Sequence, residues 1–265
     1  VQVSSIVDTQ LASLLGGGAV AALGYAQLVS TLPLSLFGVS VAAAALPDMS
    51  RDAAAQAHGA IRQRLAEALR QLSFFALPSA FALASLSGAT VGALFQTGSF
   101  GGSETDVVGG VLAAYAIGIP AQASVKLLAS GHYAVGDTRT PVKVAAISVA
   151  LSAALSWALM RWFGAAGIAL GASAGSYVNL ALNYASLRRR FGPLGGGAEW
   201  RALAVCALAA TLAAQAAGLA AGWAGPASWP ALVGGLLSFG VAYGSVCVIL
   251  RHPDAGRLLI WTRRR

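Results

Sequence analysis

The stretch SWPALVGGLLSFGVAYGSVCVIL, residues 228–250, contains no charged residue along its whole length. A helix needs about 20 consecutive apolar residues to cross the hydrocarbon core of a bilayer, so this stretch predicts a membrane-spanning helix. Turn and charge signals separate seven further apolar runs. The sequence therefore predicts an all-α, polytopic transmembrane bundle of about eight spans, at residues 1–15, 19–47, 65–96, 105–131, 141–162, 165–187, 201–222 and 228–250.

The composition agrees with a membrane protein. Of the 265 residues, 57% are hydrophobic and 10% are charged, and the mean hydropathy is +0.71. Soluble domains carry about 25% charged residues, so the composition excludes a soluble enzyme. The formal net charge of +8 does not indicate nucleic-acid binding, because the cations lie in short loops between apolar runs. We expect the bilayer as a partner and no nucleic acid.

The chain opens in the middle of an apolar pattern at Val1, without an initiator Met. Its first apolar run ends by Leu15, which is shorter than a comfortable span. We expect the sequence to be a fragment whose upstream part is missing.

The cations fix the orientation of the predicted spans. Alternate loops and the tail hold fourteen of them: Arg51, Arg62, Arg64, Arg139, Lys143, Arg188, Arg189, Arg190, Arg201, Arg251, Arg257, Arg263, Arg264 and Arg265. The opposite loops hold only Arg161, together with the acids Glu104 and Asp106. Because Lys and Arg concentrate in cytoplasmic loops, the basic loops and the C-terminus are expected in the cytoplasm.

The basic loop at residues 48–64 has two interpretations. Its Ala-rich part, 53–66 with scattered Arg, is typical of an amphipathic helix on the membrane surface. The alternative is a solvated connection that enters the next span.

Several residues inside the predicted spans are unusual for a lipid environment. Pro33, Pro78 and Pro120 each remove a backbone hydrogen bond, which favours kinked spans that move during transport, although a kink can also serve packing. Asp8 and Lys126 are ionisable residues within spans, where charge is costly, so Asp8 is expected to face a polar interior. Lys126 either does the same or extends toward the interface.

Smaller polar groups add two candidate faces. Gln27, Ser30 and Thr31 form a polar face just before Pro33, and Ser152 and Ser156 lie four residues apart on one face of the fifth span. Small hydroxyls in membrane helices are more often packing residues than ligands.

No enzyme motif is present in the sequence. His58, His132 and His252 fall in predicted loops without a carboxylate or Cys at metal-ligand spacing, and Cys206 and Cys247 lie singly in apolar spans. The Gly-rich stretches 16–18 and 195–197 lack the strand, Lys and Ser/Thr of a phosphate-binding loop. We therefore expect a protein that is not an enzyme.

A series of motifs resembles the MurJ (MviN) family of lipid II flippases. These motifs run in order along the chain as GYAQ (24–27), LPLSLFGV (32–39), LPDMSR (46–51), LFQTGSF (94–100), GIP (118–120), Lys126 with Tyr133, GDTRTPVK (136–143) and GIAL (167–170). The GDTRTPVK stretch is similar to the most distinctive loop of that family. The last two spans match by position and hydrophobicity only.

The resemblance implies a fold of fourteen helices, in which two six-helix lobes are followed by an appended pair. This chain would then comprise the second lobe at 1–190, and the appended pair with a basic tail at 191–265. The implied function is alternating-access flipping of undecaprenyl-linked peptidoglycan precursor (lipid II) across the bacterial inner membrane. The implied partners are lipid II, or a similar polyprenyl-pyrophosphate saccharide, and the N-terminal lobe of the same protein.

The resemblance also suggests a transport cavity, whose candidate residues are Asp8, Gln27, Thr31, Pro33, Lys126 and Arg139. Some family members hold a sodium ion between the first and fifth helices of this lobe. Here Asp8 matches one ligand, while Ser152 and Ser156 stand where Asn and Asp are expected. Leu28 also replaces an Arg that usually follows the position of Gln27. No cofactor is expected apart from this sodium ion.

Two other functions remain open at the level of sequence. The first is an exporter of another lipid-linked oligosaccharide or of a drug, which the small number of cations in this cavity would suit. The second is a membrane scaffold without transport, which would be recognised by an upstream lobe that lacks cavity arginines.

Overall fold

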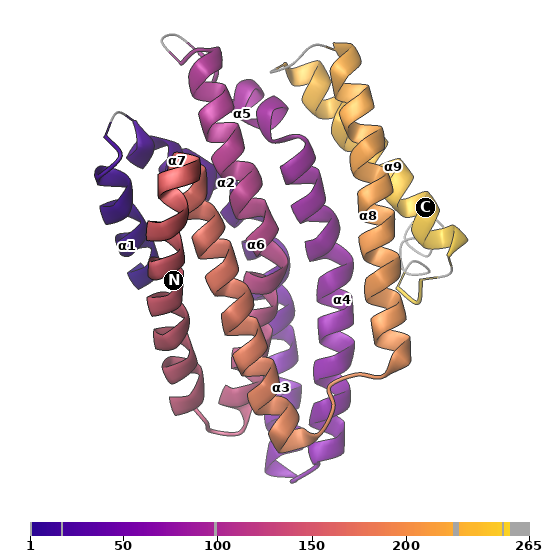
Figure 1. Cartoon of the computed structure of the whole chain (residues 1–265). Coiled ribbons are helices and arrows are strands. Elements are labelled where there is room, and N and C mark those ends of the chain that lie inside the picture. Colours follow the sequence, from indigo (N-terminus) through magenta and orange to yellow (C-terminus); the bar gives the residue numbers. More distant parts are fainter. Residues whose placement is uncertain (1, 17, 98–99, 225–227, 251, 255–265) are drawn as a thin grey trace.

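The computed structural model describes residues 2–16, 18–97, 100–224, 228–250 and 252–254, and the secondary structure within these ranges is entirely helical. The helices run roughly side by side as one bundle (Figure 1). An all-α bundle is therefore confirmed. The elements are α1 (Gln2–Ser13), α2 (Ala19–Pro33), the π-helix η1 (Leu34–Val39), α3 (Ser40–Ala54), α4 (His58–Ser85), α5 (Ser87–Phe95), α6 (Gly102–Ala134), α7 (Arg139–Phe191), α8 (Gly197–Ala224) and α9 (Trp229–Ile249).

Helix α6 forms the centre of the bundle and packs against α7, α4, α2, α3 and α5. Its side chains fill several core clusters, in which Leu112 and Leu127 are fully buried. Small residues allow its neighbours to approach closely, as expected where no hydrophobic force acts between helices in lipid. A Cβ atom on Gly118 would lie 3.1 Å from the Cα atom of Ser173.

The second predicted span is one continuous helical rod from α2 through η1 to α3, and Pro33 does not break it. The proline, which has no backbone N–H, instead directly precedes the π-helical turn of η1. The hydrogen bonds there span five residues instead of four, so the helix continues past the proline. Gly38 in this turn lies close to α6, since a Cβ atom there would be 3.1 Å from the Cα atom of Ala123.

The third predicted span is bent by 73° between α4 and α5. The bend falls at Leu86 and Ser87 rather than at Pro78, which lies inside α4. Pro120 is likewise inside the continuous helix α6. Neither proline therefore breaks its helix.

The connection predicted at 48–64 is much shorter than expected, and residues 53–66 do not form a separate surface helix. Helix α3 continues to Ala54 and α4 begins at His58, so only residues 55–57 connect them. Gln56 there has a φ of 55°, which ends the helix. Arg64 forms ion pairs with Asp52 and, at 3.2 Å, with Asp48 across the turn. The basic residues therefore extend the helices past their apolar parts.

Helix α7 contains two antiparallel arms, because Gly164 has a non-helical conformation (φ 57°, ψ −135°). The Ser152 hydroxyl donates to the Gly171 carbonyl at 3.3 Å, and the Ser156 hydroxyl donates to the Ile168 carbonyl at 3.0 Å. Ser156 follows Ser152 in the sequence, whereas its partner Ile168 precedes Gly171. This reversed order is that of an antiparallel hairpin. The arms 139–163 and 165–191 agree with the predicted fifth and sixth spans.

Helices α8 and α9 pack against each other, and α8 packs against α4 (Figure 1). The Tyr243 hydroxyl on α9 donates to the Phe74 carbonyl on α4 at 2.8 Å. Beyond α9, the His252 ring stacks on Phe74, and Asp254 forms an ion pair with Arg70 of α4 at 3.0 Å. Both polar and apolar contacts thus hold the pair against α4.

The predicted number of about eight spans is not confirmed. Five helices are long and apolar enough to cross a membrane, or six if α4 with α5 counts as one span. Two features account for the difference. Helix α1 has only 12 residues, and the two arms of α7 count as a single helix.

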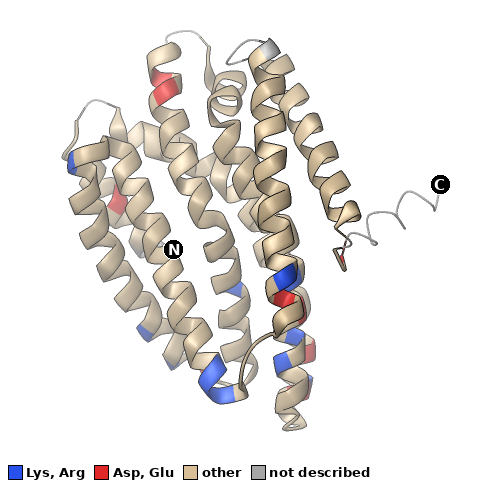
Figure 2. Ribbon diagram, turned by 45° about the vertical axis from the view of Figure 1, so that its right-hand side comes forward, with Lys and Arg blue, Asp and Glu red and all other residues tan. Residues whose placement is uncertain are grey.

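The cations gather toward one end of the bundle, and the middle of the helices is almost free of charge (Figure 2). Arg139 begins α7 and Arg188, Arg189 and Arg190 end it, so both arms of the hairpin carry their charge at the same end. Arg161 lies next to the Gly164 turn at the other end, with its guanidinium 3.8 Å from the centroid of the Trp157 ring. Arg251 and the tail cations from Arg257 onward lie outside the described residues.

Candidate functional site

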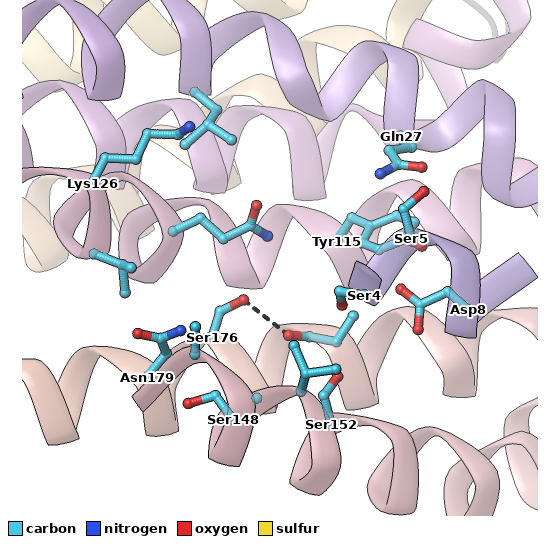
Figure 3. Close-up of a pocket in the computed structure, with 17 residues that line it drawn as sticks. Ser4, Ser5, Asp8, Gln27, Tyr115, Lys126, Ser148, Ser152, Ser176 and Asn179 are labelled. Carbon is cyan, nitrogen blue, oxygen red and sulfur yellow. Dashed lines mark hydrogen bonds between the residues drawn. The ribbon is translucent and has the colours of Figure 1, made fainter. Parts of the chain in front are cut away.

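A cavity of about 170 Å³ opens between α1, α2, α6 and α7 within the bundle. Helices far apart in the sequence contribute polar side chains to it (Figure 3). The polar residues of its lining are Ser4, Ser5, Asp8, Gln27, Tyr115, Gln122, Lys126, Ser148, Ser152, Ser176 and Asn179. Four of the eight residues predicted for transport or sodium binding, Asp8, Gln27, Lys126 and Ser152, meet here.

Asp8 lies at one end of the cavity and is 7% exposed. Ser4 and Ser5 precede it by one helical turn on α1, so the carboxylate and two hydroxyls share one face of this helix. The figure shows the Asp8 side chain on the side of Ser4 and Tyr115 (Figure 3). The expectation that Asp8 faces a polar interior agrees with this placement.

Lys126 lies at the opposite end of the same cavity (Figure 3). Helix α6 continues to Ala134, so Lys126 is eight residues, or about 12 Å, from the end of the helix. Gln122 precedes it by one turn, and Asn179 faces the cavity from the second arm of α7. A cation and two amides therefore offer hydrogen-bond donors at this end.

Gln27 lines the cavity from α2, but its predicted neighbours do not. The Thr31 hydroxyl donates to the Gln27 carbonyl at 2.8 Å, and the Thr31 side chain is exposed. Pro33 ends α2, just before η1, and is outside the lining. Arg139 is exposed at the first residue of α7. These three residues are not brought to the cavity.

Ser156 is also outside the lining, because its hydroxyl is directed at Ile168 within the hairpin. It is fully buried where Gly171 packs against it, since a Cβ atom on Gly171 would lie 2.6 Å from the Cα atom of Ser156. Ser152 has a similar contact with Gly175 but also reaches the cavity. Both serines thus join the arms of α7, and only Ser152 can serve the cavity as well.

The oxygen donors near Asp8 are of the kind that sodium prefers, although they supply only one carboxylate. Ser4, Ser5 and Ser152 line the cavity with Asp8, and their hydroxyl oxygens retain lone pairs. Among the described residues, no group of three or more His, Cys, Asp or Glu side chains converges on a metal position. The residues fit sodium in kind, and the sodium site stays a prediction.

Asp137 organises the loop after α6. The Asp137 carboxylate accepts a hydrogen bond from the Thr140 backbone N–H at 3.0 Å, and this bond lowers the pKa of Asp137. Nδ1 of buried His132 lies 3.4 Å from the same carboxylate, and Arg190 lies 4.0 Å away. Asp137 thereby ties the start of α7 to its end.

Sequence reasoning missed the amides and most hydroxyls of the lining. Gln122 and Lys126 are one turn apart on α6, and Ser148, Ser152 and Ser156 continue one spacing of four along α7. Ser176 and Asn179 are three residues apart on the second arm. This helical spacing of polar residues was the available signal, because one face of a span that repeats polar groups faces protein or water rather than lipid.

Comparison with known proteins gives a consistent result. The family model described as "Lipid II flippase MurJ" matches residues 1–233. The chain is 36% identical over 189 residues to the probable lipid II flippase MurJ of Rhizobium meliloti (strain 1021), covering 70% of this chain and 35% of that protein. It is 33% identical over 192 residues to the lipid II flippase MurJ of Burkholderia cenocepacia, covering 71% and 37%.

A solved structure, the lipid II flippase MurJ in an inward closed conformation, has a similar fold. The TM-score is 0.75 at 22% sequence identity, over 94% of this chain and 51% of that one. The chain thus spans about a third of the length of the curated relatives, and about half of the solved one.

Proposed function

This chain belongs to the MurJ family of lipid II flippases, and from that membership we propose that it forms one lobe of a transporter that moves lipid II across the bacterial inner membrane. In this proposal residues 1–190 are the second lobe and 191–265 are the appended pair with its tail. Family membership supports the function. The cavity lined by Lys126 is the observation from which we assign substrate binding to particular residues.

The chemistry of the substrate explains the need for such a cavity. A polyprenyl-pyrophosphate saccharide carries negative charge and many hydroxyls, neither of which crosses hydrocarbon without polar partners. Lys126 supplies a cation for the pyrophosphate, and Gln27, Gln122 and Asn179 supply amide donors and acceptors for the sugars. The proposed cycle requires binding and conformational change, without any covalent step on the substrate.

The small volume of the cavity supports the proposal that this lobe is one wall of a larger site. At about 170 Å³ it is smaller than the roughly 300–1,000 Å³ of drug-sized ligand pockets. A saccharide with a pyrophosphate would need the opposite lobe to complete the site. The upstream lobe would therefore supply further cations, which compensates for Leu28 at the position where the family usually has Arg.

The gathering of cations at one end supports an orientation with that end in the cytoplasm (Figure 2). The end of α9 and the basic tail would then be cytoplasmic as well. Reporter fusions at the loop 135–138 and at the C-terminus test this: both should be active only for a cytoplasmic reporter. Activity of an external reporter at either position would reverse the orientation.

Depletion of the protein in growing cells tests the proposed function. The amount of lipid II accessible to an externally added probe should fall when the protein is depleted, and should recover on re-expression. Unchanged external accessibility under depletion would refute lipid II flipping by this protein.

A further inference from the structure

A second cavity, of about 480 Å³, lies at the basic end of the bundle between the first turns of α4 and the connection from α7 to α8. It is larger than the central cavity and separate from it, because the two share no lining residue. Its charged and amide residues are Arg62, Gln63, Glu67, Arg70 and Glu199.

One face of α4 forms one wall of this cavity. Gly59, Arg62, Gln63, Ala66, Glu67 and Arg70 recur at the spacing of a single helical face. Gly59 and Ala66 provide room between the long side chains, and a Cβ atom on Gly59 would meet no atom within 4 Å. The charged groups are therefore arranged around an open space.

The connection before α8 forms the opposite wall. Gly195 has a φ of 103°, which favours glycine, and this turns the backbone along the cavity. Glu199 then accepts a hydrogen bond from the Gly196 backbone N–H at 2.6 Å. The Glu199 carboxylate is thereby held at the rim of the cavity.

The charges of the two walls are of both signs. Arg70 forms an ion pair with Asp254 at 3.0 Å, and Glu67 accepts a hydrogen bond from Gln63 at 2.9 Å. Within the described residues Arg62 has no carboxylate at ion-pair distance. The cavity thus offers one unpaired guanidinium together with the carboxylates of Glu67 and Glu199.

One guanidinium beside two carboxylates disfavours the binding of a ligand that carries charge of a single sign. A purely anionic headgroup would meet two carboxylates, and a simple cation would meet Arg62. A group with a phosphate and an ammonium on a short linker can satisfy both, since guanidinium matches phosphate and carboxylate matches ammonium.

The position of the cavity at the basic end of the bundle favours a lipid headgroup over a soluble ligand. It lies at the end of the bundle where cations gather, and Trp200 in the first turn of α8 is 63% exposed. Tryptophan and arginine concentrate at the headgroup level of membrane proteins. We propose that this cavity binds the headgroup of an aminophospholipid, phosphatidylethanolamine, with its phosphate on Arg62 and its ammonium between Glu67 and Glu199.

Native mass spectrometry of the complete transporter, purified in detergent and stripped of lipid, tests the proposal. Phosphatidylethanolamine should bind more tightly than phosphatidylglycerol. Arg62→Gln should weaken its binding by about tenfold or more, because the charge-assisted contact to the phosphate is lost. Arg62→Lys should retain most of it, and a Glu67→Gln/Glu199→Gln variant should lose the preference for phosphatidylethanolamine.

Arg189→Gln is the matched control, because Arg189 is exposed at the same end of the bundle and outside the cavity. It should leave binding unchanged. Equal binding of phosphatidylglycerol, equal loss in Arg189→Gln, or competition by soluble phosphoethanolamine at the same concentration as the lipid would overturn the proposal. The readout is binding alone, so these outcomes leave the proposed flipping function unaffected.

Discussion

Ser156 and Gly171 face each other across the hairpin of α7, and a Cβ atom on Gly171 would lie 2.6 Å from the Cα atom of Ser156. Gly167, Gly171 and Gly175 recur every four residues on the second arm, opposite serines with the same spacing on the first. Small residues at this spacing let helix backbones approach closely, which is the main source of association in lipid.

Gly171→Ala should therefore separate the arms. Because the new Cβ atom would overlap backbone atoms of Ser156, we expect a loss of about 1–3 kcal/mol in stability. Thermal unfolding of the purified protein in detergent measures it. Gly110→Ala is the control, since a Cβ atom on Gly110 meets no atom within 4 Å. Equal melting temperatures for both variants would contradict the packing account.

Lys126→Ala should impair complementation of a depleted strain, whereas Lys126→Arg should preserve it. Loss of one charge-assisted contact corresponds to about tenfold weaker binding of a pyrophosphate. Cell growth and external accessibility of lipid II measure the effect. Full activity of Lys126→Ala, expressed at the wild-type level, would show that the cation at this end of the cavity is not used.

Asp8→Asn tests the predicted sodium site. If sodium binds at Asp8, transport in proteoliposomes should be faster in sodium than in potassium, and Asp8→Asn should remove this difference. Ser152→Ala should reduce it, while Ser156→Ala should not, because the Ser156 hydroxyl is directed at Ile168. The sodium site would be rejected if the wild-type protein showed no preference between the two ions.

The ion pair between Arg70 and Asp254 should hold the α8–α9 pair against α4. Replacing Arg70 by Ala leaves the buried Asp254 carboxylate without this partner, so we expect a clear loss of stability. In a double-mutant cycle with Asp254→Asn, the coupling should be about 0.5–3 kcal/mol. Additive effects of the two substitutions would show that the pair contributes nothing as a pair.

Asp137 should make stability depend on acid pH. Its folded pKa is lowered below the ordinary 3.8, chiefly by the Thr140 backbone hydrogen bond. The stabilisation is therefore present above the unfolded pKa and is lost as the pH falls through the lowered folded pKa. Asp137→Asn should melt at a lower temperature than wild type near pH 7, and the difference should vanish once the pH falls below the folded pKa of Asp137. A constant difference at all pH values would argue against this role.

The sequence predicted the bundle because long apolar runs leave few alternatives, and both arms of α7 lie where two spans were expected. It misplaced the connections, since hydropathy ends a span at the first cations while α4 continues as a helix through Arg62 and Arg64. In lipid headgroups a charged helix still satisfies its own backbone hydrogen bonds, so charge does not end it.

The cavity was predictable only in part. Asp8 and Lys126 are conspicuous because ionisable groups are costly in lipid. Gln122 and Asn179 are amides in mainly apolar helices, and their role depends on α6 meeting the second arm of α7. That juxtaposition follows from tertiary packing, which no local pattern contains.

Photo-crosslinking to lipid II tests most directly whether the substrate enters this cavity. A photoreactive amino acid in place of Gln122, in the complete transporter, should crosslink to lipid II, and the yield should fall when Lys126→Ala is added. The same probe at Ile249, 75% exposed at the end of α9 and outside the cavity, should not crosslink to the headgroup. Equal crosslinking at both positions, or none at Gln122, would contradict the account.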